Sequence, residues 1–378
     1  MNRPLLHVVH SLDPARGGPS ELVRQLCLAH AAMGVASEVA TLDAQHAATL
    51  GTWPAPVHAF YGHANYGWTS AFTPWLRARA SKFSGIFVHG LWQWQGFGTR
   101  QALHGTEARY WLFPHGMLDP WFREASPWRH ARKAAYWKLL EQRVVRDAAG
   151  VVFTSDEERR AGRGTFQPWP AKREFVVPLG TTPPPWPAEK LRARFEARFP
   201  QLRGERILLF LGRLHEKKGC DLLVDAFRRV APPMHLVFAG PCADARYEAD
   251  LRARAEGLRV TFTGPLYGDD KWAALAAAEV FILPSHQENF GVAVVEALAS
   301  GVPVLLSQRV NIWREIFDDG AGFAETDDVD GIARLLERWR WASADQAAMR
   351  LAAARCFATR FDIRQTAENL VALISSRP

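Results

Sequence analysis

The stretch EVFILPSHQENFGVAVVEALAS, residues 279–300, decides the fold of the C-terminal half of the chain. Its first five residues predict a strand, Pro284 breaks the strand, and Gly291 opens an apolar, helix-forming run. Strand, loop and helix in this order form the repeating unit of parallel α/β sheets. Because such sheets bind ligands beyond the carboxyl ends of their strands, residues 284–291 form a candidate binding loop.

Two carboxylates mark this loop and the helix after it. Glu288 lies in the loop, and Glu296 lies roughly two turns into the helix. The amides at the helix start, including that of Gly291, offer the positive end of a helix dipole to an anion. One carboxylate can then reach a polyhydroxyl group and the other a ribose, with a phosphate between them. This arrangement predicts a nucleotide-sugar site, although spacing alone also fits an exposed loop acid and a solvated helix acid.

The same alternation of strands and helices runs through the whole chain. Strands are predicted at residues 5–9, 37–41, 85–89, 110–113, 150–154, 174–177, 206–211, 235–239, 259–263, 280–283 and 302–306. The longer helices are predicted at residues 21–33, 127–148, 219–230 and 362–375. This pattern predicts an α/β protein with two Rossmann-like domains in tandem.

Residues 178–187, PLGTTPPPWP, separate the two halves of the chain. Five prolines in these ten residues cannot continue a helix or a central strand, so the segment is a linker. We expect domains at residues 1–180 and 181–360, followed by a terminal helix within residues 361–378. A chain of 378 residues is long enough for two such cores.

Composition and the first residues indicate in which cellular compartment the protein works. The four cysteines are scattered and indicate neither a disulfide framework nor a zinc site, which favours a reducing cytosol. The first ten residues are too short and too broken by His to be a signal peptide, and no apolar run approaches the ~18–20 residues of a membrane span. We therefore expect a cytoplasmic protein, soluble or peripheral on the inner face of the plasma membrane.

The positive charge lies entirely in the first half. Residues 1–180 hold 20 Lys and Arg against 13 Asp and Glu, whereas residues 181–378 hold 26 of each. The excess is densest in residues 121–146, where seven Lys and Arg are interleaved with aromatic residues. An anionic membrane surface fits this segment, and an ordinary solvated helix packed through its aromatics fits as well. Nucleic acid is not expected as a partner, because no nucleic-acid-binding motif accompanies the charge.

Two cations follow the strand at residues 206–211. Arg213 can grip phosphate oxygens with two hydrogen bonds, and Lys218 adds a second charge at the start of a helix. Together they could stabilise the charge on a leaving nucleotide, work otherwise done by a metal, so we expect neither a metal nor a cofactor. Asp328 and Asp330 have the spacing of a metal motif, but they precede a predicted helix, where acids favour the first turn. For Arg213 and Lys218, the alternative is an ordinary cationic loop on a solvated face.

Further candidates lie in loops after other strands. Gly17 and Gly18 follow the first strand and would let backbone approach a bound group closely, with a plain tight turn as the alternative. His115 and His89 each follow a strand in a His-Gly step, and either imidazole could hydrogen-bond a sugar hydroxyl. Leu266 lies in the Gly-Pro-Leu-Tyr loop after the strand at residues 259–263.

With these motifs the sequence resembles the retaining glycosyltransferases of the GT-B fold, family four, the glycosyl transferases group 1. The resemblance rests on Glu288, seven residues and Glu296, on Phe290-Gly291, and on the Gly-Arg…Lys-Gly setting of Arg213 and Lys218. It implies two Rossmann-like domains facing each other across a cleft, with the acceptor on the first and the donor on the second. It also implies that the terminal helix crosses back to the first domain.

The resemblance also implies residue roles. Glu288 would hold the donor sugar and support positive charge on its ring, Glu296 would bind the ribose, and Arg213 and Lys218 the diphosphate. His115 matches a catalytic-region histidine better than His89 does. The loops of residues 17–18, 264–267 and 290–291 would also approach the donor.

The function implied is metal-independent transfer of a sugar, with retention, from a nucleoside-diphosphate sugar to a hydroxyl of a glycan acceptor. The setting would be surface polysaccharide biosynthesis on a lipid-linked oligosaccharide. Two alternatives stay open: another GT-B enzyme such as a nucleotide-sugar epimerase, and a non-catalytic protein that binds nucleotide sugars or polyanions.

Overall fold

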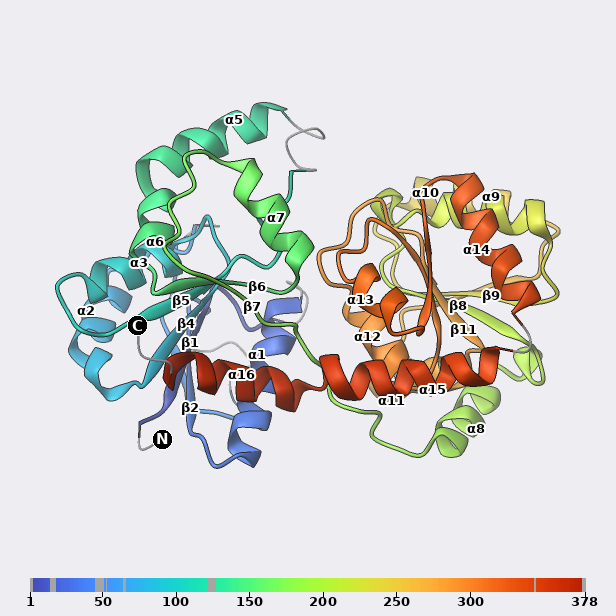
Figure 1. The fold of residues 1–378 in the computed structure, drawn as a ribbon, viewed down its shortest axis with the longest axis horizontal. Helices are drawn as coiled ribbons and strands as arrows, with labels where there is room; N and C mark the ends of the chain where they lie inside the picture. Colours follow the sequence, from blue (N-terminus) through green and yellow to red (C-terminus); the bar gives the residue numbers. More distant parts are fainter. Residues whose placement is uncertain are drawn as a thin grey trace. The chain divides into compact units, whose positions relative to one another are not determined.

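The computed structural model describes residues 3–13, 18–44, 51, 53–63, 66–120, 127–342 and 345–375. The chain folds into two compact units (Figure 1). The N-terminal unit comprises Met1–Gly180 and Ile363–Pro378, and the C-terminal unit comprises Thr181–Asp362. The chain therefore passes between the units twice, once inside the proline-rich linker and once just before the terminal helix.

The N-terminal unit is built on a parallel sheet whose order is β3-β2-β1-β4-β5-β6-β7 in the described part of the chain. Its strands are β1 (Leu5–Val9), β2 (Ser37–Thr41), β3 (Val57–Ala59), β4 (Gly85–His89), β5 (Tyr110–Phe113), β6 (Gly150–Phe153) and β7 (Glu174–Val176). The order reverses between β1 and β4, and the carboxyl edge at such a reversal is the usual ligand position in open α/β sheets.

Helices cover both faces of this sheet. They are α1 (Gly18–Ala32), α2 (Phe72–Arg79), α3 (Trp94–Leu103), α5 (Pro127–Tyr136), α6 (Gln142–Asp147), α7 (Asp156–Thr165) and α16 (Ile363–Ser375). On one face, Val23 of α1 packs with Val9 and Val39. On the other, Leu6 and Val8 share a core with side chains of α2, α3 and α6. Alternate residues of the same strands therefore point into two cores, as expected for strands buried on both faces.

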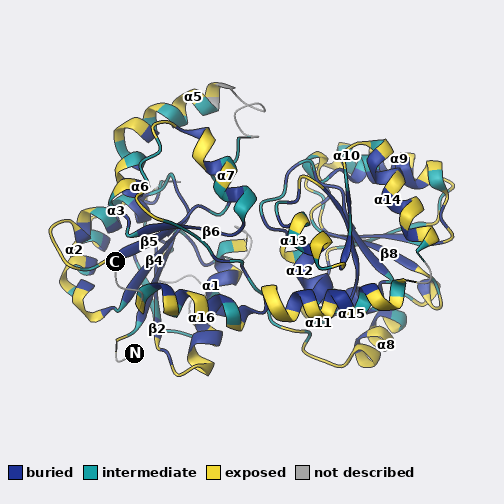
Figure 2. Cartoon of the chain, in the orientation of Figure 1, coloured by how far each residue is buried: buried dark blue, intermediate teal, exposed yellow. Residues whose placement is uncertain are grey.

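The C-terminal unit repeats the design with the order β10-β9-β8-β11-β12-β13, all parallel. Its strands are β8 (Ile207–Leu211), β9 (His235–Ala239), β10 (Val260–Gly264), β11 (Val280–Leu283), β12 (Val304–Ser307) and β13 (Gly322–Glu325). Its helices are α8 (Ala188–Arg198), α9 (Cys220–Val230), α10 (Ala245–Arg254), α11 (Gly268–Ala277), α12 (Val292–Ala299), α13 (Trp313–Asp318), α14 (Val329–Trp341) and α15 (Gln346–Cys356). Figure 2 shows buried strands beneath helices with exposed outer faces in both units. The predicted α/β class with two Rossmann-like domains is confirmed.

Several predicted boundaries need correction. The helix predicted at residues 21–33 begins at Gly18, because Pro19 is tolerated in a first turn. The strand predicted at residues 302–306 begins at Val304, after Pro303, which has no N–H to donate to a ladder. The helix predicted at residues 127–148 contains a π-helical segment, Trp137–Glu141, between α5 and α6.

The terminal helix belongs to the N-terminal unit. It begins at Ile363, so the second unit ends at Asp362, two residues later than the predicted limit. The Thr366 hydroxyl donates to the carbonyl of Pro178 at 2.9 Å, which ties the helix to the end of the first unit's chain. None of the helices in the described ranges is both long and apolar enough to cross a membrane.

Candidate functional site

The candidate donor site lies where the strand order of the C-terminal unit reverses. Strands β8 and β11 pair directly, and each is followed by a loop that leads toward a helix. Residues 212–219 follow β8, and residues 284–291 follow β11. The two loops that carry the predicted residues therefore begin side by side at the carboxyl edge, the usual ligand position in an open α/β sheet.

Close backbone contact fixes these two loops against each other. Gly219 has φ +65°, and a Cβ on it would lie 2.4 Å from the carbonyl oxygen of Pro284. The amide of His286 donates to the carbonyl of Lys217 at 2.9 Å. Only glycine fits at the contact, because any side chain would both strain the backbone and force the loops apart. Lys218, between these two contacts, is thereby held against the second loop.

Lys218 and Glu288 form an ion pair between the loops. The Lys218 ammonium contacts Oε2 of Glu288, and the two side chains are 19% and 20% exposed. The backbone of Glu288 is also held, since its amide donates to the carbonyl of Arg309 at 2.9 Å and its carbonyl accepts from the amide of Asn311 at 3.0 Å. A carboxylate and an ammonium are therefore placed together on well-fixed backbone.

The neighbouring residues differ in what they can offer a ligand. Arg213 is exposed and makes no ion pair within the described part of the chain. Gly291, with φ +80°, is the N-cap of α12. The ring of Phe290 is buried and packs edge-on against Phe361, with centroids 5.9 Å apart. Phe290 is thus a core side chain, and only its backbone could meet a donor.

Glu296 lies in the second turn of α12 and is more deeply buried than Glu288. Its side chain is 6% exposed and pairs with the ammonium of Lys271, which comes from α11. The sequence prediction missed Lys271, although it lies in the helix that follows the loop of Leu266. Leu266 itself is buried, so its side chain packs in the core.

In the N-terminal unit, His115 follows β5 with a left-handed backbone, φ +51°. Its Nε2 lies 3.0 Å from Nδ1 of His89, so the two histidines weighed as alternatives are hydrogen-bonded partners. Burial lowers the pKa of His115 to about 4, so the imidazole is neutral near pH 7. Gly18 is the exposed first residue of α1, and Gly17 lies outside the described residues.

A buried carboxylate holds the loop of His115. Glu158, on α7, accepts from the amide of Gly116 at 2.5 Å and from the amide of Thr154 at 2.6 Å. Both donors come from segments that follow adjacent strands, β5 and β6. The left-handed conformation of His115 is thereby held in place from outside the loop. Sequence reasoning missed Glu158, since the Ser-x-x-Glu pattern at residues 155–158 reads as an ordinary helix start.

Comparison with known families assigns the chain. A family profile described as Glycosyl transferases group 1 matches residues 193–354, and one described as Glycosyl transferase 4-like domain matches residues 17–180. Together the two matches cover most of the chain. The chain belongs to the group 1 glycosyltransferases. The two profiles fall on either side of the linker, in agreement with the two units of the structure.

Curated relatives match this glycosyltransferase over part of their length. It is 30% identical over 139 residues to the sulfoquinovosyl transferase SQD2 of Arabidopsis thaliana, covering 37% of this chain and 26% of that protein. It is 29% identical over 208 residues to the D-inositol 3-phosphate glycosyltransferase of Mycobacteroides abscessus, covering 52% of this chain and 46% of the relative. The chain thus spans less than half the length of these relatives.

Solved structures match the glycosyltransferase over its full length. HepE of Anabaena in complex with UDP aligns with a TM-score of 0.78 at 18% identity, over 99% of this chain and 100% of that chain. Sucrose-phosphate synthase of Thermosynechococcus elongatus aligns with a TM-score of 0.73 at 22% identity, over 99% and 98%. At these identities the likeness establishes the shared GT-B fold, which confirms the predicted fold class.

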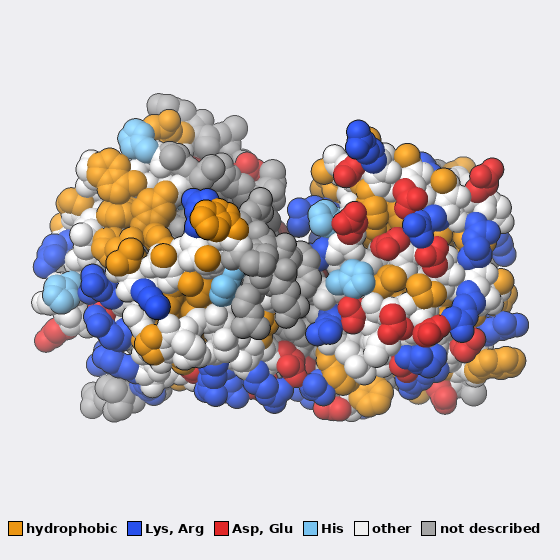
Figure 3. Space-filling view, turned by 90° about the horizontal axis from the view of Figure 1, so that it is seen from above, with side chains coloured by type: hydrophobic (Ala, Val, Ile, Leu, Met, Phe, Trp, Pro, Cys, Tyr) orange, Lys and Arg blue, Asp and Glu red, His pale blue; other side chains and the backbone are white. Residues whose placement is uncertain are grey.

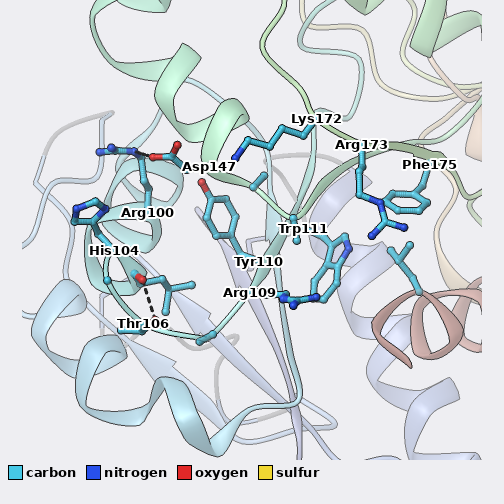
Figure 4. Close-up of a pocket in the computed structure, with 16 residues that line it drawn as sticks. Arg100, His104, Thr106, Arg109, Tyr110, Trp111, Asp147, Lys172, Arg173 and Phe175 are labelled. Carbon is cyan, nitrogen blue, oxygen red and sulfur yellow. Dashed lines mark hydrogen bonds and ion pairs between the residues drawn. The ribbon is translucent and has the colours of Figure 1, made fainter. Parts of the chain in front are cut away.

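The N-terminal unit of the glycosyltransferase also has a basic cavity that the sequence did not predict. The cavity measures about 490 Å³ and lies at the amino ends of β5, β6 and β7, the sheet edge opposite His115 (Figure 4). Its lining cations include Arg109, Lys172 and Arg173. The lining carboxylate Asp147 is already paired with Arg100 at 2.7 Å. The cavity is therefore cationic, and it is separate from the edge that carries the candidate site.

The acids with metal-motif spacing have structural partners in this glycosyltransferase. Asp328 is the N-cap of α14 and accepts from the amide of Gly331 at 2.7 Å. Asp330 pairs with Arg229. The prediction that these acids belong to a helix start is confirmed. Within the described ranges, no three His, Cys, Asp or Glu side chains gather as a metal site would require.

Proposed function

We propose that this glycosyltransferase transfers a sugar, with retention at the anomeric carbon, from a nucleoside-diphosphate sugar to a hydroxyl of a glycan acceptor. The observation that carries the proposal is the Lys218–Glu288 pair at the carboxyl ends of β8 and β11. Arg213 and the amino end of α12, in the same two loops, supply the further positive charge that a diphosphate requires. Structures of HepE with UDP and with UDP-glucose have the same fold, which supports a nucleotide-sugar donor.

The roles follow from where charge develops during transfer. As the bond between the anomeric carbon and the phosphate oxygen breaks, its electron pair goes to the diphosphate and the sugar ring becomes cationic. Lys218 and Arg213 stabilise the diphosphate, and the carboxylate of Glu288 stabilises the ring. The acceptor hydroxyl forms the new bond on the face that the diphosphate leaves. Its proton passes to a phosphate oxygen of the departing group, so atoms and charge balance.

In this assignment the side chains and the helix end supply all the positive charge that faces the diphosphate, so no metal ion is needed. The ammonium of Lys218 and the guanidinium of Arg213 would together offset the two charges of the diphosphate link. The pairing with Glu288 keeps Lys218 in position before a donor enters. When the diphosphate arrives, the ammonium has a second anion within reach, and the Glu288 carboxylate turns to the sugar.

The acceptor we propose is a lipid-linked oligosaccharide used in surface polysaccharide biosynthesis. One structural neighbour, WaaG, is described as a glycosyltransferase involved in lipopolysaccharide biosynthesis and aligns with a TM-score of 0.67 at 16% identity. The basic excess of the first half of the chain also fits an enzyme that works at an anionic membrane surface.

The segment proposed for membrane docking, residues 121–146, is only partly suited to it. Trp137 is buried, and the ammonium of Lys133 lies over the ring of Trp92 at 4.9 Å, so neither faces solvent freely. Trp128 and Leu139 are 76% and 65% exposed and can insert at an interface. Residues 121–126 and the side chain of Arg129 lie outside the described part. The docking surface we propose therefore consists of Trp128, Arg132, Lys138, Leu139 and Arg143.

A panel of nucleoside-diphosphate sugars, incubated with the full chain and followed by mass spectrometry, tests the proposed reaction. We expect release of a nucleoside diphosphate and a mass gain on a glycan or lipid-linked acceptor, both absent in Glu288→Gln. A changed sugar without any transfer would identify an epimerase instead. Saturable donor binding with no turnover across all acceptors would identify a non-catalytic binding protein.

A further inference from the structure

A diagonal row of histidines crosses the sheet of the N-terminal unit and ends at His115. Strands β1, β4 and β5 are neighbours, with His7 opposite Phe87 and His89 opposite Phe113. Each histidine of the row therefore lies two residues further along the next strand, on the same face of the sheet. The row begins with His7 on β1, where the strand order reverses, and ends with His115 at the carboxyl edge of the sheet.

Direct hydrogen bonds join the row. Nδ1 of His7 lies 3.0 Å from Nε2 of His89, and Nδ1 of His89 lies 3.0 Å from Nε2 of His115. His7 and His89 are 0% and 2% exposed. The ring of His30, on α1, stacks on His7 with centroids 5.7 Å apart and closes the buried end of the row.

Burial keeps these imidazoles neutral. It lowers the pKa of His7 and of His89 well below the ordinary value, and lowers that of His115 to about 4. A neutral imidazole carries one N–H, so each nitrogen pair must consist of one donor and one acceptor. Because His89 uses both of its nitrogens, the two hydrogen bonds must run in the same direction. The row therefore has only two proton arrangements.

The buried end of the row distinguishes the two arrangements. Nε2 of His7 has no hydrogen-bond partner within the described part of the chain. If the protons pointed toward His7, this nitrogen would carry an N–H with no acceptor in the core, which is rare in folded proteins. If they point toward His115, the N–H without an internal acceptor is Nδ1–H of His115, which is partly exposed at the sheet edge. The second arrangement avoids the orphaned donor.

We infer that His7 and His89 are positioning residues that fix His115 as the tautomer with its proton on Nδ1. His115 then presents a hydrogen-bond donor at the carboxyl edge of the sheet and cannot accept a proton there. It would orient a substrate oxygen that accepts this hydrogen bond, such as a sugar hydroxyl, and would not act as a general base. The identity of the group that His115 hydrogen-bonds during the reaction rests on the proposed function, whereas the tautomer of His115 does not.

Nitrogen-15 NMR of histidine-labelled full-length protein tests the tautomer without any substrate. Long-range correlations from the ring protons distinguish a protonated from an unprotonated nitrogen, and the signals of His115 are those missing in His115→Gln. We expect His115 at pH 7 to be neutral with a protonated Nδ1 and a bare Nε2. A protonated Nε2 in the wild type would overturn the inference.

Paired variants test whether the row is responsible. His7→Phe removes the donor to His89, whereas His7→Gln can still donate an amide N–H to the same nitrogen. We expect mixed tautomers at His115 in His7→Phe and a restored Nδ1–H in His7→Gln. His89→Phe, whose ring can still stack on Phe113, should also release the tautomer of His115. An unchanged tautomer in His7→Phe and His89→Phe, with circular dichroism showing both folded, would exclude the positioning role.

Transfer kinetics then separate the inference from the proposed function. If both hold, His7→Phe should lower kcat in proportion to the fraction of His115 that has lost its Nδ1–H, about twofold for an equal mixture of tautomers, with unchanged nucleotide affinity and recovery in His7→Gln. If the NMR result holds but neither the wild type nor any variant transfers sugar, the proposed function is wrong and the inference about the His115 tautomer remains. Normal kcat in a His7→Phe enzyme with mixed tautomers would show that the fixed donor has no part in turnover.

Discussion

At the scale of single residues, the ion pair between Lys218 and Glu288 joins two motifs that the sequence predicted separately. The partners are 70 residues apart in the chain, and they meet because β8 and β11 are adjacent in the sheet. The sequence shows that each follows a strand, but only the strand order shows that these strands are neighbours. Lys271, the partner of Glu296, was unpredictable for the same reason, because its helix follows a different strand.

The two candidate phosphate-binding cations should both matter for donor binding. Arg213→Ala and Lys218→Ala should each weaken binding of a nucleoside diphosphate by ~1.5–3 kcal/mol, the range for charged hydrogen bonds. Isothermal titration calorimetry measures the loss, with Arg203→Ala as a control at an exposed arginine elsewhere in the same unit. Binding should survive EDTA. Unchanged affinity in both variants, or loss in EDTA with recovery in Mg²⁺ or Mn²⁺, would contradict the proposed charge balance.

The two glutamates should have separable effects. Glu288→Gln should abolish transfer while nucleotide affinity stays nearly unchanged, because the charge acts mainly when the sugar ring becomes cationic. Glu296→Gln should lower nucleotide affinity, and it should also lower the melting temperature, since it leaves the ammonium of Lys271 without its carboxylate. Turnover assays and calorimetry on both variants measure the difference. Indistinguishable behaviour in both assays would contradict the division of roles.

At the scale of elements, the buried central strands were predicted, whereas two of the four edge strands, β3 and β13, were missed. Six predicted strands coincide with the structure, among them β1, β4 and β11, because strands buried on both faces are continuous apolar runs. The edge strands β3 and β13 are short and only partly buried, so their sequences carry little apolar signal. The π-helical segment at Trp137–Glu141 likewise has no recognisable sequence pattern.

This π-helical segment carries a buried acid whose titration should be measurable. Burial raises the pKa of Glu141 to about 8, and the backbone amide of Trp92 opposes this to a smaller extent. The unfolded carboxyl titrates near 4.5, so the native state binds more protons between these two values. The stability contributed by the neutral carboxyl is therefore complete below about pH 4.5 and is lost as the pH rises through about 8.

Replacing the acid with its neutral isostere should remove this dependence. The free energy of unfolding of Glu141→Gln should be close to that of the wild type at pH 5 and higher than that of the wild type at pH 9, by on the order of 4 kcal/mol. Thermal unfolding at the two pH values, followed by circular dichroism, measures it. Glu107→Gln, at an exposed glutamate of the same unit, should show no such difference. A Glu141→Gln effect of equal size at both pH values would mean that Glu141 is ionised in the native state.

At the scale of the whole molecule, charge is divided unevenly between two similarly built units. Figure 3 shows basic and hydrophobic side chains together on the visible face of the N-terminal unit, whereas acidic and basic side chains alternate on that of the C-terminal unit. The sequence predicted this asymmetry from its charge counts. It singled out the cations of the α5–α6 segment, but it did not reveal the cavity cations, because Arg109 and residues 172–173 are far apart in the chain and meet only at the amino ends of β5–β7.

These two groups of cations allow a matched test of membrane docking. One variant replaces Arg132, Lys138 and Arg143, all exposed on the α5–α6 segment, with Gln, and the control replaces Arg109, Lys172 and Arg173 of the cavity. Lys133 is left intact because it lies over Trp92. Each variant loses three positive charges, so any effect of net charge alone is equal in both.

Sedimentation with vesicles that contain anionic lipid should distinguish the two variants. Cations near an anionic surface contribute roughly 1 kcal/mol each, so loss of three docking cations should weaken binding by about two orders of magnitude. Binding of the wild type should also fall steeply with salt and be absent on neutral vesicles. The cavity variant should bind nearly as the wild type does, since its cations come from other segments, just before β5 and β7. Equal losses in both variants would mean that only net charge matters, and a loss confined to the cavity variant would move the docking surface to the cavity at the amino ends of β5–β7.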